Sequence, residues 1–271
     1  MIKQLIKKIV KSESLQDSLR LVYNSAKILS QDLLTKEMKD RAKGLPDGFP
    51  YPPSKLIFTI IAIPWVSEFY KSGKIIFDDM NAMFVKHKST LADGANILDF
   101  GCGCGRIIRH FASQKKYNLF GSDLNPELIS WCDKNLTFGK FSTNNLVPTL
   151  NYADNFFDLI YARSVFTHLG KELQLEWITE LKRILKPGGL LYFTTHGNVT
   201  ISPLSKAEQE KYNMNEIVLH NSFGEGDNKY SSYQSYKWTT ENLLEGFELI
   251  GFQEGCENPH LRQDVYLFRK L

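Results

Sequence analysis

The segment 97–106 places an apolar run in front of a turn that carries glycine at every second position. The alternating residues are Asp99, Gly101, Gly103 and Gly105. A buried strand that leads into such a turn and then into a helix lets main-chain atoms approach a bound cofactor, because no side chain intervenes. The dinucleotide fingerprint G-x-G-x-x-G would require a small residue at position 106 or 108, where this chain has Arg106 and Ile108. The turn therefore predicts a cofactor site that is not of the nicotinamide or flavin type.

Beyond residue 94, apolar segments typical of strands alternate with segments of helical periodicity. This alternation predicts a parallel sheet whose strands are connected by helices. The parallel strands are expected at 96–100, 117–122, 140–143, 157–162 and 190–195. The clearest helix is expected at 171–185, and Lys186-Pro187-Gly188-Gly189 should end it.

Two further strands are expected near the C-terminus, at 247–254 and 264–269. The connection between them is too short for a crossover helix, so we expect an antiparallel pair at the far edge of the sheet. The predicted fold class is α/β, with a seven-stranded, mostly parallel Rossmann-like sheet.

The chain is expected to divide near residue 94 into a helical N-terminal extension, 1–94, and a cofactor-binding domain, 95–271. Helix-like periodicity before the boundary is interrupted by a turn-rich segment at 44–53. An insert at 197–238 leaves the cofactor edge of the sheet and is rich in aromatic residues. We expect it to cover the substrate, with the N-terminal extension acting as the opposite wall and lid.

Composition limits the partners and the compartment. The formal net charge of +3 is far below the excess typical of proteins that bind phosphate backbones, so no nucleic-acid partner is expected. The four cysteines form no disulfide framework and show no zinc-ligand spacing, which favours a reducing, cytoplasmic compartment. The most apolar stretch, 56–66, is too short to span a bilayer. Residues 1–11 predict a basic amphipathic helix, which either packs on the protein or lies on an anionic membrane surface.

Several motifs in order resemble those of the class I S-adenosylmethionine-dependent methyltransferases, and the resemblance extends over about 95–196. It rests on the glycine turn, on 152–162 with its Phe-Asp strand, on 164–169, and on the Lys-Pro-Gly-Gly turn. The resemblance implies the seven-stranded methyltransferase fold, S-adenosylmethionine as cofactor, S-adenosylhomocysteine as product and a small-molecule acceptor. No acid occurs between residues 159 and 170, where metal-dependent members need a carboxylate cluster, so no metal is expected.

Asp123 stands at the end of the second expected strand, about where a carboxylate accepts hydrogen bonds from a cofactor ribose. The alternative for Asp123 is a helix cap for residues 124–127. The resemblance implies that Asp99 orients the methionine part of the cofactor and that the segment 144–146 meets the adenine, although an Asn pair is also common in turns. The expected cofactor-binding residues are Asp99, Gly101, Cys102, Gly103, Gly105, Asp123, Leu124, Asn144, Asn145, Leu146 and Ala162.

Methyl transfer to a hydroxyl needs alignment of the reacting atoms and a proton acceptor, for which histidine is the usual residue. His168 and His196 follow the fourth and fifth strands at the carboxyl edge of the sheet, so we rank His168 first and His196 second as catalytic residues. A capping or loop-stabilising role is the alternative for both. The expected substrate-binding residues are Tyr70, Arg163, His220 and Tyr233.

The expected function is therefore methyl transfer by in-line displacement to a small molecule, with a sugar or another hydroxyl as the favoured acceptor. A protein that binds the cofactor without transferring methyl is the alternative, because no residue is an unmistakable catalyst. If the extension is a lid, removal of residues 1–55 should weaken acceptor binding and leave cofactor binding nearly intact.

Overall fold

A computed structural model describes residues 33–221 and 224–271 of the chain. The helices are α3 (Ser54–Ile61), α4 (Val66–Lys86), α5 (Ile108–Ala112), α6 (Pro126–Asn135), α7 (Lys171–Ile184), α8 (Lys206–Asn213) and α9 (Tyr236–Leu243), with short 3-10 helices η1 (Phe166–His168) and η2 (Asn198–Thr200). The strands are β1 (Asn96–Phe100), β2 (Asn118–Asp123), β3 (Gly139–Thr143), β4 (Phe157–Ala162), β5 (Leu185–Thr195), β6 (Val218–Asn221), β7 (Tyr230–Tyr233), β8 (Phe247–Gln253) and β9 (Asp264–Lys270). Residues 33–43 are also helical.

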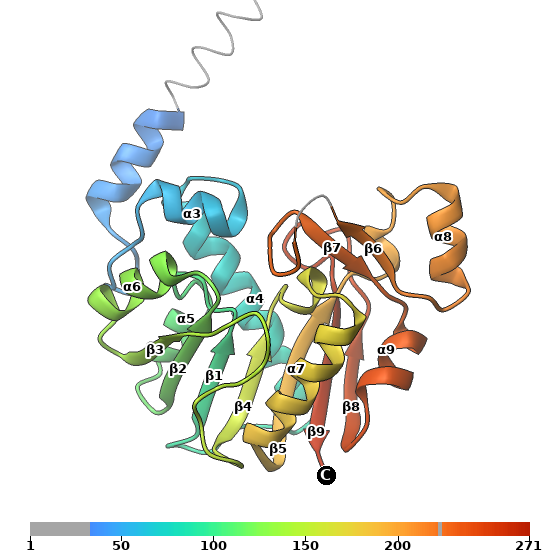
Figure 1. The fold of residues 1–271 in the computed structure, drawn as a ribbon. Helices are drawn as coiled ribbons and strands as arrows, with labels where there is room; N and C mark the ends of the chain where they lie inside the picture. Colours follow the sequence, from blue (N-terminus) through green and yellow to red (C-terminus); the bar gives the residue numbers. More distant parts are fainter. Residues whose placement is uncertain (1–32, 222–223) are drawn as a thin grey trace, which may run out of the picture.

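Seven of the strands form one twisted sheet in the order β3-β2-β1-β4-β5-β9-β8 (Figure 1). The five strands from β3 to β5 pair in parallel, whereas β9 pairs antiparallel with both β5 and β8. The expected α/β class, the mostly parallel sheet and its C-terminal antiparallel pair are thus confirmed. The carboxyl ends of the parallel strands all lie at the upper edge in Figure 1, beneath α3 and the β6–β7 hairpin.

The strand bounds agree with the expectation closely, except at β5. The expected start at residue 190 is wrong, because β5 begins at Leu185, directly after α7. Its pairing with β4 jumps from Phe157↔Leu185 to Leu159↔Leu190, so the residues between Leu185 and Leu190 form an irregular segment. Helix α7 therefore ends at Ile184, one residue before the expected end, and Lys-Pro-Gly-Gly forms the irregular segment of β5 that follows.

Helices cover both faces of the sheet because each buried strand alternates its side chains between two apolar cores. On one face, α7 and α9 pack against residues such as Leu98, Ile160 and Phe193. On the other face, α4 and α5 pack against residues such as Ile97 and Tyr192. The N-terminal extension therefore supplies, through α4, a large part of one core.

The β6–β7 hairpin lies within the expected insert and was not predicted as strands. It packs against η1 and places the 224–229 loop over the upper edge of the sheet (Figure 1). No helix in the described parts of the chain is both long and apolar enough to cross a bilayer. The expected basic helix at 1–11 lies outside the described residues.

Candidate functional site

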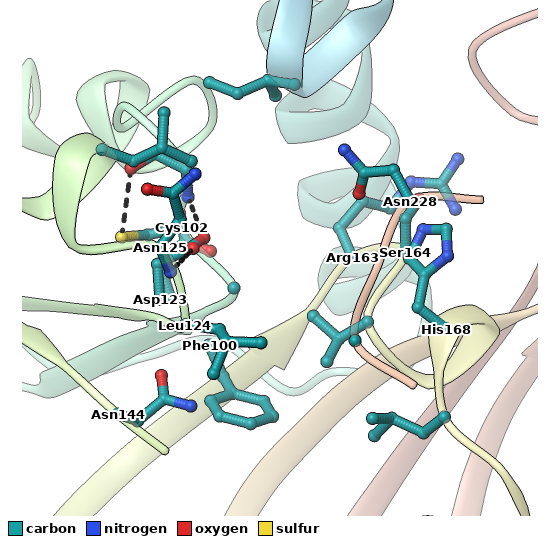
Figure 2. Close-up of a pocket in the computed structure, with 18 of the residues that line it drawn as sticks. Phe100, Cys102, Asp123, Leu124, Asn125, Asn144, Arg163, Ser164, His168 and Asn228 are labelled. Atoms are coloured by element: carbon teal, nitrogen blue, oxygen red, sulfur yellow. Dashed lines mark hydrogen bonds between the residues drawn. The ribbon is translucent and has the colours of Figure 1, made fainter. Parts of the chain in front are cut away.

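A cavity of about 400 Å³ opens where β1, β2, β3 and β4 end, within the size range typical of small-molecule sites. Figure 2 shows Cys102, Asp123 and Asn125 on one side of it and Arg163, Ser164 and His168 on the other. Most of the expected cofactor residues line this cavity: Asp99, Gly101, Cys102, Gly103, Asp123, Leu124, Asn144, Asn145 and Leu146. We call it the cofactor cavity.

The glycine turn needs glycine for two reasons: its backbone has positive φ angles, and neighbouring atoms leave no room for a Cβ. Gly101, Gly103 and Gly105 all have positive φ, at 79°, 55° and 72°, a region that other residues adopt at a cost. A Cβ atom on Gly101 would lie 2.3 Å from Cγ2 of Val165. At Gly105 the same atom would approach Leu136 of the α6 C-cap instead, at 2.6 Å. Gly105 therefore permits helix packing, and it does not line the cofactor cavity.

Asp123 binds the glycine turn directly. Its Oδ2 accepts a hydrogen bond from the Gly103 amide at 2.8 Å, and its Oδ1 accepts one from the Asn125 amide at 2.8 Å. The N-cap of α6 is Asn125, whose side chain accepts from the Glu127 amide. The alternative role of Asp123 as the helix cap is thus taken by its neighbour, and its carboxylate faces the cavity.

Asp99 lies at the floor of the cavity and is only 2% exposed. Its Oδ2 has no hydrogen-bond partner among the described residues. Burial raises the pKa of this carboxyl to about 8, although the neighbouring Tyr161 hydroxyl and, after it, the Arg106 guanidinium oppose the shift. An unsatisfied acid of this kind is suited to a cationic group of a ligand, because the ligand would supply the missing partner.

The Asp99→Asn variant is expected to gain stability relative to wild type as pH rises. Between the unfolded pKa near 4 and the folded pKa of about 8, the folded protein retains a proton that the unfolded chain releases, so wild-type stability falls with pH. The difference in the free energy of unfolding between the variant and wild type should change by about 1.4 kcal/mol per pH unit, or by about 3 kcal/mol between pH 5 and pH 7. Urea unfolding of both proteins at the two pH values measures it, and parallel pH profiles would contradict the prediction.

Asn144 is held by protein groups. Its Oδ1 accepts from the Ser122 hydroxyl at 2.6 Å, and its Nδ2 donates to the Asn145 carbonyl at 2.8 Å. The Leu146 carbonyl in turn accepts from Trp177 Nε1 at 2.9 Å. The segment 144–146 therefore reaches the cavity as a rigid turn, in agreement with both readings of the Asn pair.

On the side of the cavity opposite Asp123, the side-chain amide oxygen of Gln263 holds several residues in place. Gln263 Oε1 accepts from Arg163 Nη1 at 2.6 Å, from Ser164 Oγ at 2.9 Å and from Thr194 Oγ1 at 2.7 Å. Ser164 has a positive φ of 60°, and its amide donates to Thr194 Oγ1 at 2.9 Å. A strained non-glycine residue that neighbouring groups hold in place is typical of functional sites.

His168 also lines the cofactor cavity, and its tautomer is determined by a backbone group. Its Nδ1 lies 2.7 Å from the Tyr230 carbonyl oxygen, which can only accept, so Nδ1 carries the proton. Burial lowers the pKa of this imidazole. His168 is therefore a neutral ring at pH 7 whose Nε2 has a free lone pair.

The loop at 224–229 covers the cavity, a role that the sequence did not reveal at residue level. The Gly226 amide donates to the His168 carbonyl at 2.8 Å. Asn228 Nδ2 donates to the Thr59 carbonyl of α3 at 2.7 Å, so the insert and the N-terminal extension meet above the cavity. Both segments do line it, through Gly226, Asp227 and Asn228 on one side and Thr59 and Ile60 on the other.

A second cavity of about 500 Å³ adjoins the first and shares Arg106, Arg163 and Ser164 with it. His196 and Tyr233 line this second cavity, with their rings stacked at a centroid distance of 4.8 Å. Burial, with the neighbouring His168 and Arg163, lowers the pKa of His196 to about 4. The two candidate histidines thus line different cavities, His168 the first and His196 the second.

Three other expected site residues line neither cavity. Ala162 is fully buried in the core beside α7. Tyr70 packs its ring against His110, at a centroid distance of 4.9 Å. His220 Nε2 pairs with Glu208 Oε1 at 2.8 Å.

Few of the aromatic residues of the insert and of the N-terminal extension line the two cavities. Among the described aromatic residues of the insert and of 51–70, only Tyr233 lines either cavity. Trp238 and Phe69 are buried in apolar cores instead. Phe223 lies outside the described residues. Gly73 contributes as a spacer, because a Cβ there would lie 2.1 Å from the Arg106 carbonyl oxygen.

Comparison with known proteins agrees with this geometry. A solved S-adenosylmethionine-dependent methyltransferase from Methanosarcina mazei shares the fold, with a TM-score of 0.54 and 22% identity over 69% of this chain and 97% of that one. Residues 98–193 match the family described as "Methyltransferase domain". Residues 98–193 therefore form a methyltransferase domain, in agreement with the resemblance of their motifs to the class I S-adenosylmethionine-dependent methyltransferases. The Methanosarcina mazei structure is of an S-adenosylmethionine-dependent enzyme, and S-adenosylmethionine is the cofactor that the motifs of this chain predict.

Curated relatives are similar over part of their length. Malonyl-[acyl-carrier protein] O-methyltransferase of Pectobacterium atrosepticum is 28% identical over 43% of this chain and 44% of its own. Sterol 24-C-methyltransferase of Schizosaccharomyces pombe is 26% identical over 66% of this chain and 47% of its own. The chain thus spans less than half the length of these relatives, and their names cover both O- and C-methylation.

The residues of the methyltransferase domain fit its cofactor. The turn at Gly101 has no room for a Cβ, and Asp99 and Asp123 direct carboxyl groups to the same cavity. Within 33–221 and 224–271, no group of three or more His, Cys, Asp or Glu side chains is arranged to hold a metal ion.

Proposed function

We propose that this protein is a methyltransferase that methylates a hydroxyl group of a small molecule by in-line displacement. The observation that carries the proposal is the junction of the two cavities at Arg163 and Ser164. One cavity has the glycine turn and the two carboxyl groups that suit the cofactor, and the other leaves room for a second compound. A site with two adjoining compartments supports a transfer reaction better than simple storage of a nucleoside.

When bound, S-adenosylmethionine would supply an electrophilic methyl group. A lone pair of the acceptor would bond to its carbon, and the electrons of the carbon–sulfur bond would stay on sulfur. The chain's own residues hold the two partners in line and exclude water. Asp123, already fixed by the Gly103 and Asn125 amides, is placed to accept from a ribose hydroxyl. Asp99 is placed to pair with the cofactor's ammonium group.

The proton of the acceptor hydroxyl needs a destination, and His168 supplies one. Its Nε2 is unprotonated because the Tyr230 carbonyl keeps the proton on Nδ1. The lowered pKa keeps the ring neutral at pH 7, so that Nε2 is available as a base. His196 is the weaker candidate, because its pKa of about 4 makes it a poor base.

Calorimetric titration with S-adenosylhomocysteine, followed by a screen of hydroxyl-bearing acceptors for methylated product, tests the proposal. Binding together with product formation supports it. Binding without product from any acceptor class would favour the non-catalytic alternative, and absence of binding at millimolar concentration would reject both.

The Asp123→Ala variant is expected to bind S-adenosylhomocysteine about 10- to 100-fold more weakly, since hydrogen bonds to a charged group contribute about 1.5–3 kcal/mol. The Gly103 and Asn125 amides also lose their acceptor, so the turn itself loosens. The matched control is Asp158→Ala, which removes a β4 carboxylate that pairs with Lys186 and lies outside the cofactor cavity. Equal affinity in the two variants would exclude the ribose role.

A further inference from the structure

The second cavity has an unusual set of cations. Seven arginines lie in the described parts of the chain, and four of them pair with a carboxylate: Arg41, Arg109, Arg183 and Arg269. The other three, Arg106, Arg163 and Arg262, have no carboxylate within 4 Å among the described residues, and all three line the second cavity. The other described guanidinium groups are paired with a carboxylate, whereas those at this cavity are not.

The cavity contains little negative charge of its own. Glu68 is the one acidic residue in its described lining, and its Oε1 already lies 3.1 Å from His260 Nε2. Asp79 is close enough to influence the pKa of Arg163 but does not line the cavity and forms no ion pair with it within the described residues. Asp99 lies near enough to Arg106 to influence its pKa, but it forms no ion pair with it and does not line this cavity. Among the described residues, no carboxylate therefore forms an ion pair with any of the three arginines.

The contacts of these arginines leave donors available. Arg163 donates to Gln263 and to the His260 carbonyl, and Arg262 donates from Nη2 to the Val199 carbonyl. Arg106 donates from Nη1 to Ser72 at 3.3 Å, and its buried Nε has no partner among the described residues. Because a guanidinium has five N–H donors, each of the three retains several for a ligand.

The cofactor does not offset the positive charge of these arginines. S-adenosylmethionine has one carboxylate but two cationic centres, the ammonium and the sulfonium. Even if its carboxylate paired with Arg106, at the boundary of the two cavities, the cofactor would add net positive charge beside Arg163. The compensating anion must arrive with the other substrate.

The apolar part of the lining indicates the rest of that substrate. It consists of Ile61, Ile63, Ile76, Pro203, Pro259 and Tyr233, which stand beside small polar residues such as Ser72, Thr200 and Ser202. Such walls favour an apolar body. A compound with an apolar part and one acidic group would satisfy both the walls and the arginines.

We propose that the second cavity binds the methyl acceptor and that this acceptor is an acid, whose carboxylate or phosphate is held by Arg106, Arg163 and Arg262. This inference rests on the proposed function and names its substrate class. Arginine suits either anion because its planar fork matches both geometries.

Calorimetry with small probes tests it on the full chain saturated with S-adenosylhomocysteine. The probes are benzoate, phenyl phosphate, uncharged benzamide and cationic benzylamine, which share one ring and differ in charge. Wild type is expected to bind one of the two anions at least about tenfold more tightly than benzamide. The preferred anion identifies the acid group as a carboxylate or a phosphate.

Arg262→Gln is the decisive variant, because Arg262 is exposed and lines only the second cavity. It is expected to reduce the anion preference about tenfold. The control is Arg269→Gln, which removes the same charge at the other end of β9 and should keep the preference. Equal binding of benzoate, phenyl phosphate and benzamide, no anion binding at millimolar concentration, or equal effects of the two variants would overturn the inference. Binding of S-adenosylhomocysteine is measured in the same samples before the probes are added, and it tests the cofactor site of the proposed function separately.

Discussion

The Asp47→Ala variant is expected to lose about 3–5 kcal/mol in its free energy of unfolding, which urea denaturation measures. Asp47 pairs with Arg109, whose side chain is 0% exposed, and the two side chains are joined by bonds of 2.5 and 3.1 Å. Without the carboxylate, a buried guanidinium would remain with only the Phe49 and Pro50 carbonyls as acceptors. A buried charge without its counter-ion costs several kcal/mol, whereas the intact pair need not stabilise the fold at all.

Two further variants isolate the cause. Asp78→Ala removes the partner of Lys74 in an ion pair that is about half exposed, and we expect a change of less than about 1 kcal/mol. The double variant Asp47→Ala/Arg109→Met should recover most of the loss, since it removes the buried charge as well. A loss in Asp47→Ala no larger than in Asp78→Ala would show that Arg109 is solvated.

The Asp47–Arg109 ion pair changes what removal of residues 1–55 would test. The sequence presents 44–53 as a turn-rich hinge, so its removal was expected to affect only acceptor binding. In the structure, this segment supplies Asp47 and both carbonyl acceptors of Arg109 on α5. Truncation would therefore destabilise the cofactor-binding domain itself. Replacement of Asn228, which bonds to Thr59, is a cleaner test of the lid.

The sheet could be predicted because its signals are local. The apolar runs of β1 and β4 and the turns after them determine their own strands, and the bounds of both agree with the expectation. The hairpin was missed because β6 and β7 have only four residues each and pack on η1, a contact between distant segments. Short strands without a strong alternating pattern are determined by such tertiary packing.

The cofactor half of the site could be predicted because its residues follow strand ends in sequence order. In the second cavity, Arg163 and Tyr233 were expected as substrate-binding residues and do line it. Arg106 and Arg262 were not expected there, because they come from different parts of the chain and meet only in the fold. In the sequence, Arg106 is distinguished only as a residue that breaks the dinucleotide fingerprint. Its lack of a carboxylate partner is visible only in three dimensions.

The His168→Gln variant is expected to lower kcat by about 10²- to 10⁴-fold for a hydroxyl acceptor, with the loss in kcat rather than in the KM for S-adenosylmethionine. The matched control is His220→Gln, because His220 lies outside both cavities and pairs with Glu208. Unchanged kcat in His168→Gln would mean that the methylated atom needs no base, as for a carboxylate oxygen.

A second measurement tests the base without an acceptor. Nitrogen-15 chemical shifts of His168 at pH 7 should show a protonated Nδ1 and an unprotonated Nε2, and its pKa should lie below the ordinary value of 6.5. The carbonyl that fixes this tautomer belongs to Tyr230, the first residue of β7. The hairpin therefore does more than cover the cavity, because it determines which nitrogen of His168 can accept the proton.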